Sequence, residues 1–194
     1  DQNSCTDTAS ITISEPTPLT ISSAVIINAS CNGTNDGSIT IPGGIGGTGP
    51  YSFLWDNGAT TAGLILLTAG DYTVTITDAN ACTSTSSATI TEPAVLAAAS
   101  VVDSNITCNG ISDGGATASA TGGTMPHTYA WSNSATTASI TGIAAGTYTI
   151  TVTDNNGCTS SSSATITEPS ILNSSFSVST CDSYTWASNG TTYI

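Results

Sequence analysis

Lysine and arginine are absent from this sequence of 194 residues, whereas aspartate and glutamate together number 13, so the formal net charge is −13. Nucleic acid is therefore not an expected partner, because its binding depends on cations that neutralise phosphates. An anionic membrane surface is disfavoured for the same reason. No stretch of 18 apolar residues occurs either, so we expect no membrane insertion of this segment.

Residues that carry chemistry are also scarce. The single histidine is His127, and without lysine or arginine the chain offers few general acids, bases or oxyanion-stabilising groups. No CxxC pair accompanies that histidine, so zinc is not expected. The glycine-rich stretch 42–49 lacks the helix and the lysine of a phosphate-binding loop, and it predicts a loop between strands. We expect a protein that is not an enzyme and that uses no cofactor, calcium aside.

Cysteine is well represented, with six residues in a background rich in threonine and serine. This combination favours an oxidising, extracellular location. No signal-peptide pattern is visible, so we expect the segment to be a mature or internal part of its protein.

An internal repeat is the strongest signal in the sequence. The block that runs from a tryptophan to the sequence TEP occurs twice. Trp55 precedes Tyr72 by 17 positions, and Trp131 precedes Tyr148 by the same 17. One extra residue in the first copy, between the first cysteine and the tryptophan, is the only difference in spacing.

These spacings divide the chain into four parts. Residues 17–93 form one repeat, here called repeat 1, and residues 94–169 form a second, called repeat 2. Residues 1–16 match the end of a repeat, so we expect them to be the last strand of a preceding one. Residues 170–194 depart from the pattern and are expected to begin a different β module.

Strict alternation of apolar and polar residues predicts β-strands. In the stretch YTVTITD, Tyr72, Val74 and Ile76 point to one side and threonines to the other, as in a half-buried strand. About seven such short strands per repeat, separated by gaps rich in glycine and asparagine, are typical of an antiparallel sandwich. We therefore expect an all-β protein made of tandem immunoglobulin-like β-sandwiches.

Two aromatic positions in each repeat support this fold. Trp55 and Trp131 fall on the third strand, where an immunoglobulin-like domain has its core tryptophan. Tyr72 and Tyr148 follow the sequences LTAGD and IAAGT, which predict a tyrosine corner. All four rings are expected in the core.

The combined pattern CNGTNDGSITI, GGTGPYSFLWDNGATT and AGDYTVTITDANAC resembles the SprB-type repeat of Bacteroidetes cell-surface proteins, and the resemblance covers nearly all of residues 17–169. It implies tandem immunoglobulin-like modules on a secreted or cell-surface bacterial protein linked with gliding or adhesion. It implies no catalysis.

Four cysteines recur in the two repeats. If the strands alternate in direction, Cys31 lies in the A–B turn and Cys82 in the F–G turn, at opposite poles of one sandwich. A bond between them would need Cα atoms within about 7 Å, which is unfavourable. The A–B pole of one domain faces the F–G pole of the next, so an interdomain Cys31–Cys158 bond is favoured, with Cys82 and Cys108 bonded to adjacent repeats. The alternatives are intradomain bonds (Cys31–Cys82 and Cys108–Cys158) or the sequential pair Cys82–Cys108.

Two turns are rich in oxygen ligands, and calcium is a candidate there. They contain Asn35 with Asp36, and Asp78 with Asn80. The spacing and terminal glutamate of an EF-hand are missing, and the same residue types also suit tight turns.

The first functional hypothesis is therefore structural: modules of an extracellular adhesin stalk or surface fibre, whose partners are neighbouring repeats or copies of the same chain. The alternative is an adhesive module that binds glycans or a surface. The third hypothesis, an enzyme, is disfavoured by the scarcity of catalytic groups. Separately, residues 1–16 could complete a neighbouring subunit's sandwich by strand addition, although truncation of a longer chain is the favoured explanation.

Overall fold

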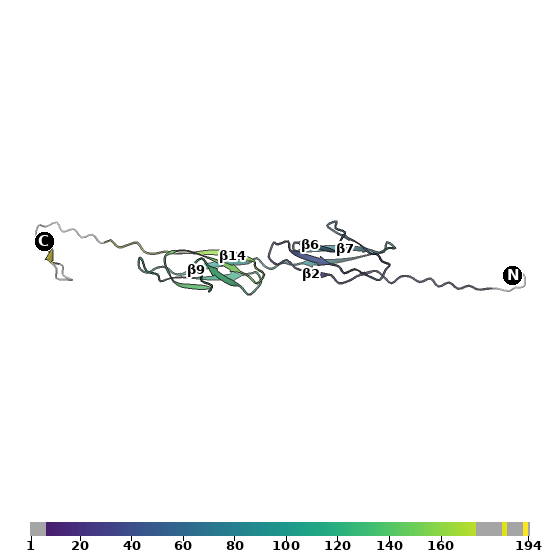
Figure 1. Ribbon diagram of the computed structural model, residues 1–194, viewed down its shortest axis with the longest axis horizontal. Helices are drawn as coiled ribbons and strands as arrows, with labels where there is room; N and C mark the ends of the chain where they lie inside the picture. The colour runs from purple at the N-terminus through teal and green to yellow at the C-terminus, as the bar shows by residue number, and fades with distance from the viewer. Residues whose placement is uncertain (1–6, 174–183, 186–191, 194) are drawn as a thin grey trace.

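The computed structural model describes residues 7–173, 184–185 and 192–193, and it is all-β. Two β-sandwiches follow one another in the chain and lie end to end along the long axis of the molecule (Figure 1). Each has its own cluster of buried side chains, one formed by repeat 1 and the other by repeat 2. Within the described residues, no helix is long and apolar enough to cross a membrane.

Repeat 1 consists of two antiparallel three-stranded sheets, with the strand orders β2-β3-β6 and β5-β7-β8. A short further pair, β1 with β4, extends the fold toward the N-terminal pole. The strands are β1 (Thr20–Ile21), β2 (Val25–Ile27), β3 (Gly37–Thr40), β4 (Gly44–Ile45), β5 (Ser52–Trp55), β6 (Gly63–Leu67), β7 (Gly70–Thr77) and β8 (Thr83–Ile90).

Repeat 2 has the same two sheets, in the orders β9-β10-β12 and β11-β13-β14. Its strands are β9 (Ala97–Ser104), β10 (Gly114–Thr121), β11 (Thr128–Trp131), β12 (Ser139–Ile143), β13 (Gly146–Thr153) and β14 (Thr159–Ile166). This arrangement of two facing antiparallel sheets is the expected immunoglobulin-like sandwich.

The extra residue of repeat 1 lies where its second strand is interrupted. In repeat 2 the second strand, β10, runs unbroken and pairs with β9 as far as Thr121. In repeat 1 the corresponding strand is divided into β3 and β4, with Pro42 in the interruption. Proline has no N–H to donate to a ladder, so the extra residue and the proline break the strand at the same place.

The alternation in the sequence correctly predicts which side chains are buried. Val74 and Ile76 of β7 belong to the core of repeat 1. Trp55, at the end of β5, is only 2% exposed, and its indole N–H donates to the carbonyl of Thr61 at 2.9 Å. Trp131 is buried in the same way in repeat 2. The core of each sandwich is therefore built around one tryptophan and its flanking aliphatic side chains.

Both tyrosine corners are present. The hydroxyl of Tyr72 donates to the carbonyl of Thr68 at 3.0 Å, and that of Tyr148 donates to the carbonyl of Ala144 at 3.0 Å. Their rings pack partly buried against the core clusters. Each tyrosine thus ties the start of a long strand (β7 or β13) to the turn that precedes it.

Leu66 in β6 has a backbone conformation that is unusual for a leucine. It forms a β-bulge and has a φ of 57°, in the left-handed region. The corresponding residue of repeat 2 is Gly142, with a φ of 67°. A side chain in this region costs about 1–2 kcal/mol relative to a right-handed conformation, and glycine avoids that cost.

We expect Leu66→Gly to stabilise repeat 1 by about 0.5–1 kcal/mol, because relief of the strain exceeds the added entropy of the unfolded chain. The denaturant midpoint of repeat 1 should rise, whereas Gly142→Leu should lower the midpoint of repeat 2. A lower midpoint for Leu66→Gly would show that this side chain is not strained.

The two ends of the chain differ from the repeats. Ile11 and Ile13 correspond by repeat spacing to Ala88 and Ile90 of β8, which are buried, but are themselves 88% and 90% exposed. No strand among the described residues pairs with residues 7–16. Near the C-terminus, β15 (Tyr184–Thr185) pairs with β16 (Thr192–Tyr193). Most of the module expected from residue 170 onward lies outside the described residues.

Candidate functional site: the joint between the repeats

A disulfide bond joins the two repeats. Cys31, in the turn between β2 and β3, is bonded to Cys158, which directly precedes β14, and the Cα atoms are 5.8 Å apart. This is the bond that the alternation of strand direction favours. It excludes the intradomain alternatives, since each would use one of these two cysteines.

The remaining two cysteines of the repeats are free and exposed. Cys82 occupies in repeat 1 the position that Cys158 occupies in repeat 2, and Cys108 corresponds in the same way to Cys31. Cys82 therefore lies at the outer pole of repeat 1 and Cys108 at the outer pole of repeat 2. The structure does not join them to each other. The predicted bonds of Cys82 and Cys108 would be made to adjacent repeats, which lie outside the described residues. These bonds therefore stay a prediction.

The linker between the repeats, residues 91–96, is docked on repeat 2. The N–H of Gly123 donates to the carbonyl of Ala94 at 2.9 Å. A Cβ on the neighbouring Gly122 would lie 1.9 Å from the carbonyl oxygen of Val95, so only glycine allows the linker to approach this closely. The two adjacent glycines thus allow the linker to pack directly against this loop. In repeat 1, the N–H of Gly47 donates to the carbonyl of Thr17 in the same way.

Asp154 organises the turn that faces repeat 1. Its carboxylate accepts hydrogen bonds from the N–H groups of Thr124, Asn156 and Cys158 at 2.8–2.9 Å. These bonds, that from Thr124 foremost, lower the pKa of Asp154 below its ordinary value. This turn also positions Asn156, whose side-chain amide donates a hydrogen bond to the carbonyl of Ser30 in repeat 1 at 2.7 Å. A direct hydrogen bond therefore accompanies the disulfide across the joint.

Asp36 organises the opposite side of the joint. Its carboxylate accepts hydrogen bonds from the hydroxyl of Ser30, from the N–H of Ser30 at 3.0 Å and from the hydroxyl of Thr34 at 2.8 Å. The hydroxyl of Ser30 is the main cause that lowers the pKa of Asp36 to about 2. The ionised carboxylate thus holds Ser30, whose carbonyl accepts from Asn156, next to Cys31.

Acid should weaken repeat 1 through Asp36. Its pKa is lower in the folded state than the ordinary 3.8, so the unfolded state binds more protons in this interval. Its stabilising contribution is complete above about pH 4 and is lost as the pH falls through about 2. We expect Asp36→Asn to lower the urea midpoint of repeat 1 at pH 7 and to flatten its dependence on pH between about 4 and 2. An unchanged pH profile would contradict this role.

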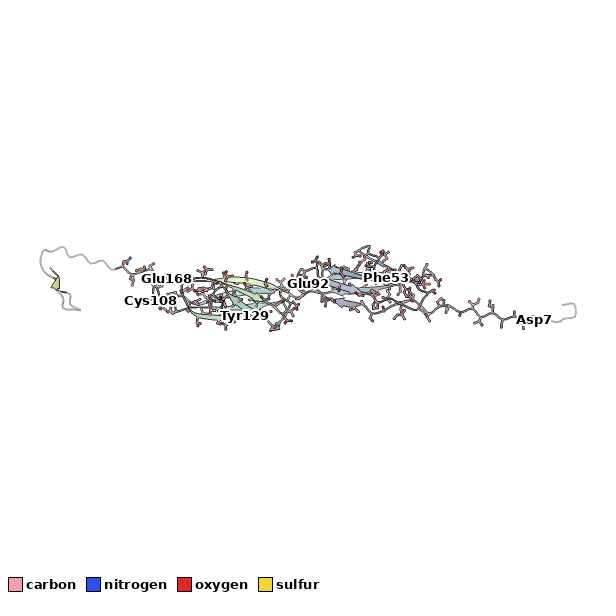
Figure 2. All side chains as sticks on the ribbon, in the orientation of Figure 1. Asp7, Phe53, Glu92, Cys108, Tyr129 and Glu168 are labelled. Atoms are coloured by element: carbon pink, nitrogen blue, oxygen red, sulfur yellow. A yellow bond between two sulfur atoms is a disulfide. The ribbon has the colours of Figure 1, made fainter. Side chains whose placement is uncertain are left out.

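Glu92 fastens the A–B turn of repeat 1 from the end of the same repeat. Its carboxylate accepts from the side-chain amide of Asn32 at 2.8 Å and from the N–H of Gly33 at 2.7 Å. Glu92 lies between the two sandwiches in Figure 2. Glu168 makes the equivalent bond to Gly110, beside Cys108 at the outer pole of repeat 2. The TEP sequence therefore clamps the CNG turn that bears the cysteine.

Removal of this clamp should expose the disulfide to reductant. We expect Glu92→Ala to make the reduction of Cys31–Cys158 by dithiothreitol roughly two- to tenfold faster, since a hydrogen bond contributes about 0.5–1.5 kcal/mol to holding the turn closed. The matched control is Glu168→Ala, which removes the same clamp at the free Cys108. Equal acceleration by both variants would mean that the clamp does not act on the joint.

The structure does not bring the candidate calcium ligands together. Asn35 and Asp36 lie at the joint, whereas Asp78 and Asn80 lie at the opposite pole of repeat 1. The carboxylate of Asp78 accepts from the N–H groups of Thr48, Asn80 and Cys82, which makes it the counterpart of Asp154. In the described part of the chain, no group of three or more histidine, cysteine, aspartate or glutamate side chains could hold a metal. Calcium binding at either turn stays a prediction.

His127 has a structural contact. Its Nε2 lies 3.0 Å from the carbonyl oxygen of Gly122. The corresponding residue of repeat 1 is Tyr51, whose hydroxyl donates to the carbonyl of Gly46. Both side chains brace the glycine loop that receives the linker.

Comparison with known proteins identifies the repeated unit. Residues 23–60 and 100–136 each match the family described as the SprB repeat. Each match begins near the first strand of a repeat and ends just after the core tryptophan, so each covers the first part of one sandwich. No curated protein matches the chain.

Several solved structures resemble the chain, and the chain spans less than two thirds of the length of each of those named here. One is from work on the structural basis of Dscam isoform specificity, with 13% identity, 80% of this chain and 47% of that chain covered, and a TM-score of 0.34. Another is the C-terminal 282-residue fragment of intimin in complex with the intimin-binding domain of its translocated receptor, with 15% identity, 76% and 64% covered, and a TM-score of 0.38. The N-terminal eight Ig domains of DSCAM isoform 1.30.30 match at 17% identity, 81% and 25% covered, and a TM-score of 0.32.

Proposed function

We propose that this chain, which carries two SprB repeats, is a non-catalytic structural section of an extracellular stalk or fibre, in which a covalent joint fixes each repeat to the next. The Cys31–Cys158 disulfide is the observation that carries the proposal. A bond between neighbouring domains restricts their relative motion, which suits a stiff spacer better than a flexible string of domains. A disulfide also requires an oxidising location, which supports a surface or secreted protein.

The joint can be extended in both directions. Cys82 and Cys108 occupy the positions of the bonded cysteines at the two outer poles, and both are exposed. The turns around them are built as at the joint, with Asp78 in place of Asp154 and Asp113 in place of Asp36. In a longer array, the A–B cysteine of each repeat would bond to the F–G cysteine of the next. The partners are then further repeats of the same protein.

Peptide mapping under non-reducing conditions, combined with small-angle X-ray scattering, tests the proposal. Chymotrypsin is suitable because the chain lacks the lysine and arginine that trypsin requires. We expect a cross-linked peptide that contains Cys31 and Cys158, and a scattering profile of a rod that becomes flexible on reduction. A Cys31–Cys82 peptide, or identical scattering before and after reduction, would overturn it.

Binding to glycans or a surface remains the alternative. Lectin-like sites commonly use exposed aromatic rings, but Trp55 and Trp131 are buried in the cores and are not available for stacking on a sugar. Binding of the oxidised chain on a glycan array would favour the alternative over a purely structural role.

A further inference from the structure

Repeat 1 exposes an apolar face that repeat 2 lacks. Three large side chains of the β2-β3-β6 sheet project outward, namely Ile27, Ile65 and Leu66, with exposures of 61%, 76% and 68%. Val25 on β2 extends the same face and is 59% exposed. We call these four residues the apolar face. Exposed apolar patches of this kind often mark interaction sites.

The counterparts in repeat 2 show that the fold does not require these residues. The position of Ile27 is taken by Ser104, that of Ile65 by Thr141 and that of Leu66 by Gly142, as the strand registers show. Asp103 precedes Ser104 at a bulge in β9. Asp103 accepts a hydrogen bond from the hydroxyl of Thr117, so this part of the repeat 2 sheet is polar. The same sandwich therefore folds with either a polar or an apolar outer surface.

The strain at Leu66 is a second observation in favour of a function for the face. A leucine occupies a left-handed bulge position that suits glycine, and most of its side chain is in solvent. Within the isolated chain it therefore contributes little packing in return for the strain. Strained residues of this kind are concentrated at functional sites.

We propose that the apolar face of repeat 1 is the contact surface between two copies of this chain. Two chains that each carry −13 repel one another over most of their surfaces, so two copies can meet most readily on a face that carries no charge. The central strand between the apolar residues contributes Ser38 and Thr40, so neither the apolar face nor its centre carries a charge. Two copies can approach here without placing carboxylates against each other.

The arrangement of the face is self-complementary. Ile27, Ser38 and Ile65 are directly paired neighbours across the three strands, so a small polar residue lies between two isoleucines. A two-fold axis through Ser38 would place Ile27 of one copy against Ile65 of the other, and Ile65 against Ile27. Face-to-face packing of sheets and two-fold symmetry are the usual forms of such contacts.

The size of the face sets the strength of the contact. Four aliphatic side chains at roughly 60–120 Å² each give about 250–500 Å² per copy, which is the range of weak and transient interfaces. We expect a Kd on the order of 100 μM in solution. Salt should strengthen the dimer, because it screens the repulsion between acidic chains and leaves apolar burial intact.

Sedimentation velocity of the full chain with Cys82→Ser and Cys108→Ser tests the inference, since these substitutions prevent disulfide-linked dimers. The sedimentation coefficient should rise with concentration up to about 1 mM, and it should rise further in high salt. Ile27→Ser with Ile65→Thr, which installs the residues of repeat 2, should abolish the rise without lowering the melting temperature. Leu66→Gly should reduce it while stabilising the repeat. The matched control is Val101→Asp in repeat 2, an exposed valine at the position of Val25, which should leave association unchanged.

A chain that stays monomeric up to about 1 mM at high salt would overturn the inference. So would association that survives Ile27→Ser with Ile65→Thr, or that is lost equally in Val101→Asp, since the contact would then lie elsewhere. None of these outcomes affects the rod proposed above, because that proposal depends on Cys31 and Cys158 and is tested by their peptide map.

Discussion

Stretching the oxidised chain from its two ends is expected to release about 430 Å less contour length than stretching the reduced chain, at about 3.4 Å per residue. The disulfide between Cys31 and Cys158 spans a sequence separation of 127 residues. A pulling force that enters repeat 1 reaches Cys31 after β1 and β2, crosses the two sulfur atoms and leaves through β14. Both core tryptophans and the strands from β3 to β13 lie inside the closed loop and bear no load.

Single-molecule force spectroscopy can measure this difference, with handles attached at the termini through peptide tags rather than cysteines. Cys82→Ser and Cys108→Ser should be present in every sample, so that only the bond at the joint varies. Cys31→Ser should unfold like the reduced chain even without reductant. Equal contour lengths for oxidised and reduced chains would show that the bond does not carry the load.

Replacement of a core tryptophan should have the largest effect on folding. We expect Trp131→Ala to cost repeat 2 about 3–5 kcal/mol, which is the usual range for a buried tryptophan. Trp131 is 3% exposed, and its indole N–H donates to the carbonyl of Thr137 at 3.0 Å, so the substitution leaves both a cavity and an unpaired carbonyl. A domain of this size has a stability of only about 4–11 kcal/mol, so repeat 2 should become marginal.

Denaturant titration followed by NMR of the backbone amides can separate the two repeats, because it reports on each sandwich without depending on the tryptophan that is replaced. Trp131→Ala should shift the transition of repeat 2 to a lower midpoint and leave that of repeat 1 in place, and Trp55→Ala should do the reverse. Tyr148→Phe is a milder comparison, since it removes one hydrogen bond to Ala144 worth about 0.5–1.5 kcal/mol. If Trp131→Ala lowered both midpoints equally, the repeats would not fold as separate cores.

Local sequence patterns predicted the features that local chemistry determines. The alternation in β7 identified Val74 and Ile76 as buried, and the turn before Tyr72 identified its hydrogen bond to the preceding backbone. The position of Cys31 relative to Cys158 followed from a topological argument, since successive antiparallel strands place their turns at alternate poles. Each of these inferences needs only strand direction and side-chain spacing.

Other features depend on backbone geometry that the sequence pattern did not reveal. The bond of Glu92 to the A–B turn joins residues about sixty positions apart, and its only sequence signal was the joint recurrence of CNG and TEP in both repeats. The repeat spacing aligns Leu66 with Gly142, but the left-handed conformation at this position became apparent only from the backbone and its bulge. Asn156 reaches Ser30 only because the joint brings the two turns together.

Covalent continuity through the joint has a consequence for resistance to proteolysis. A protease that cuts the backbone once at any point between Cys31 and Cys158 leaves the two fragments connected through their sulfur atoms. An array in which every repeat is joined in this way would tolerate one cut in each loop without shedding its distal part. In such an array the disulfide would serve as a second, redundant connection that holds the cut chain in one piece.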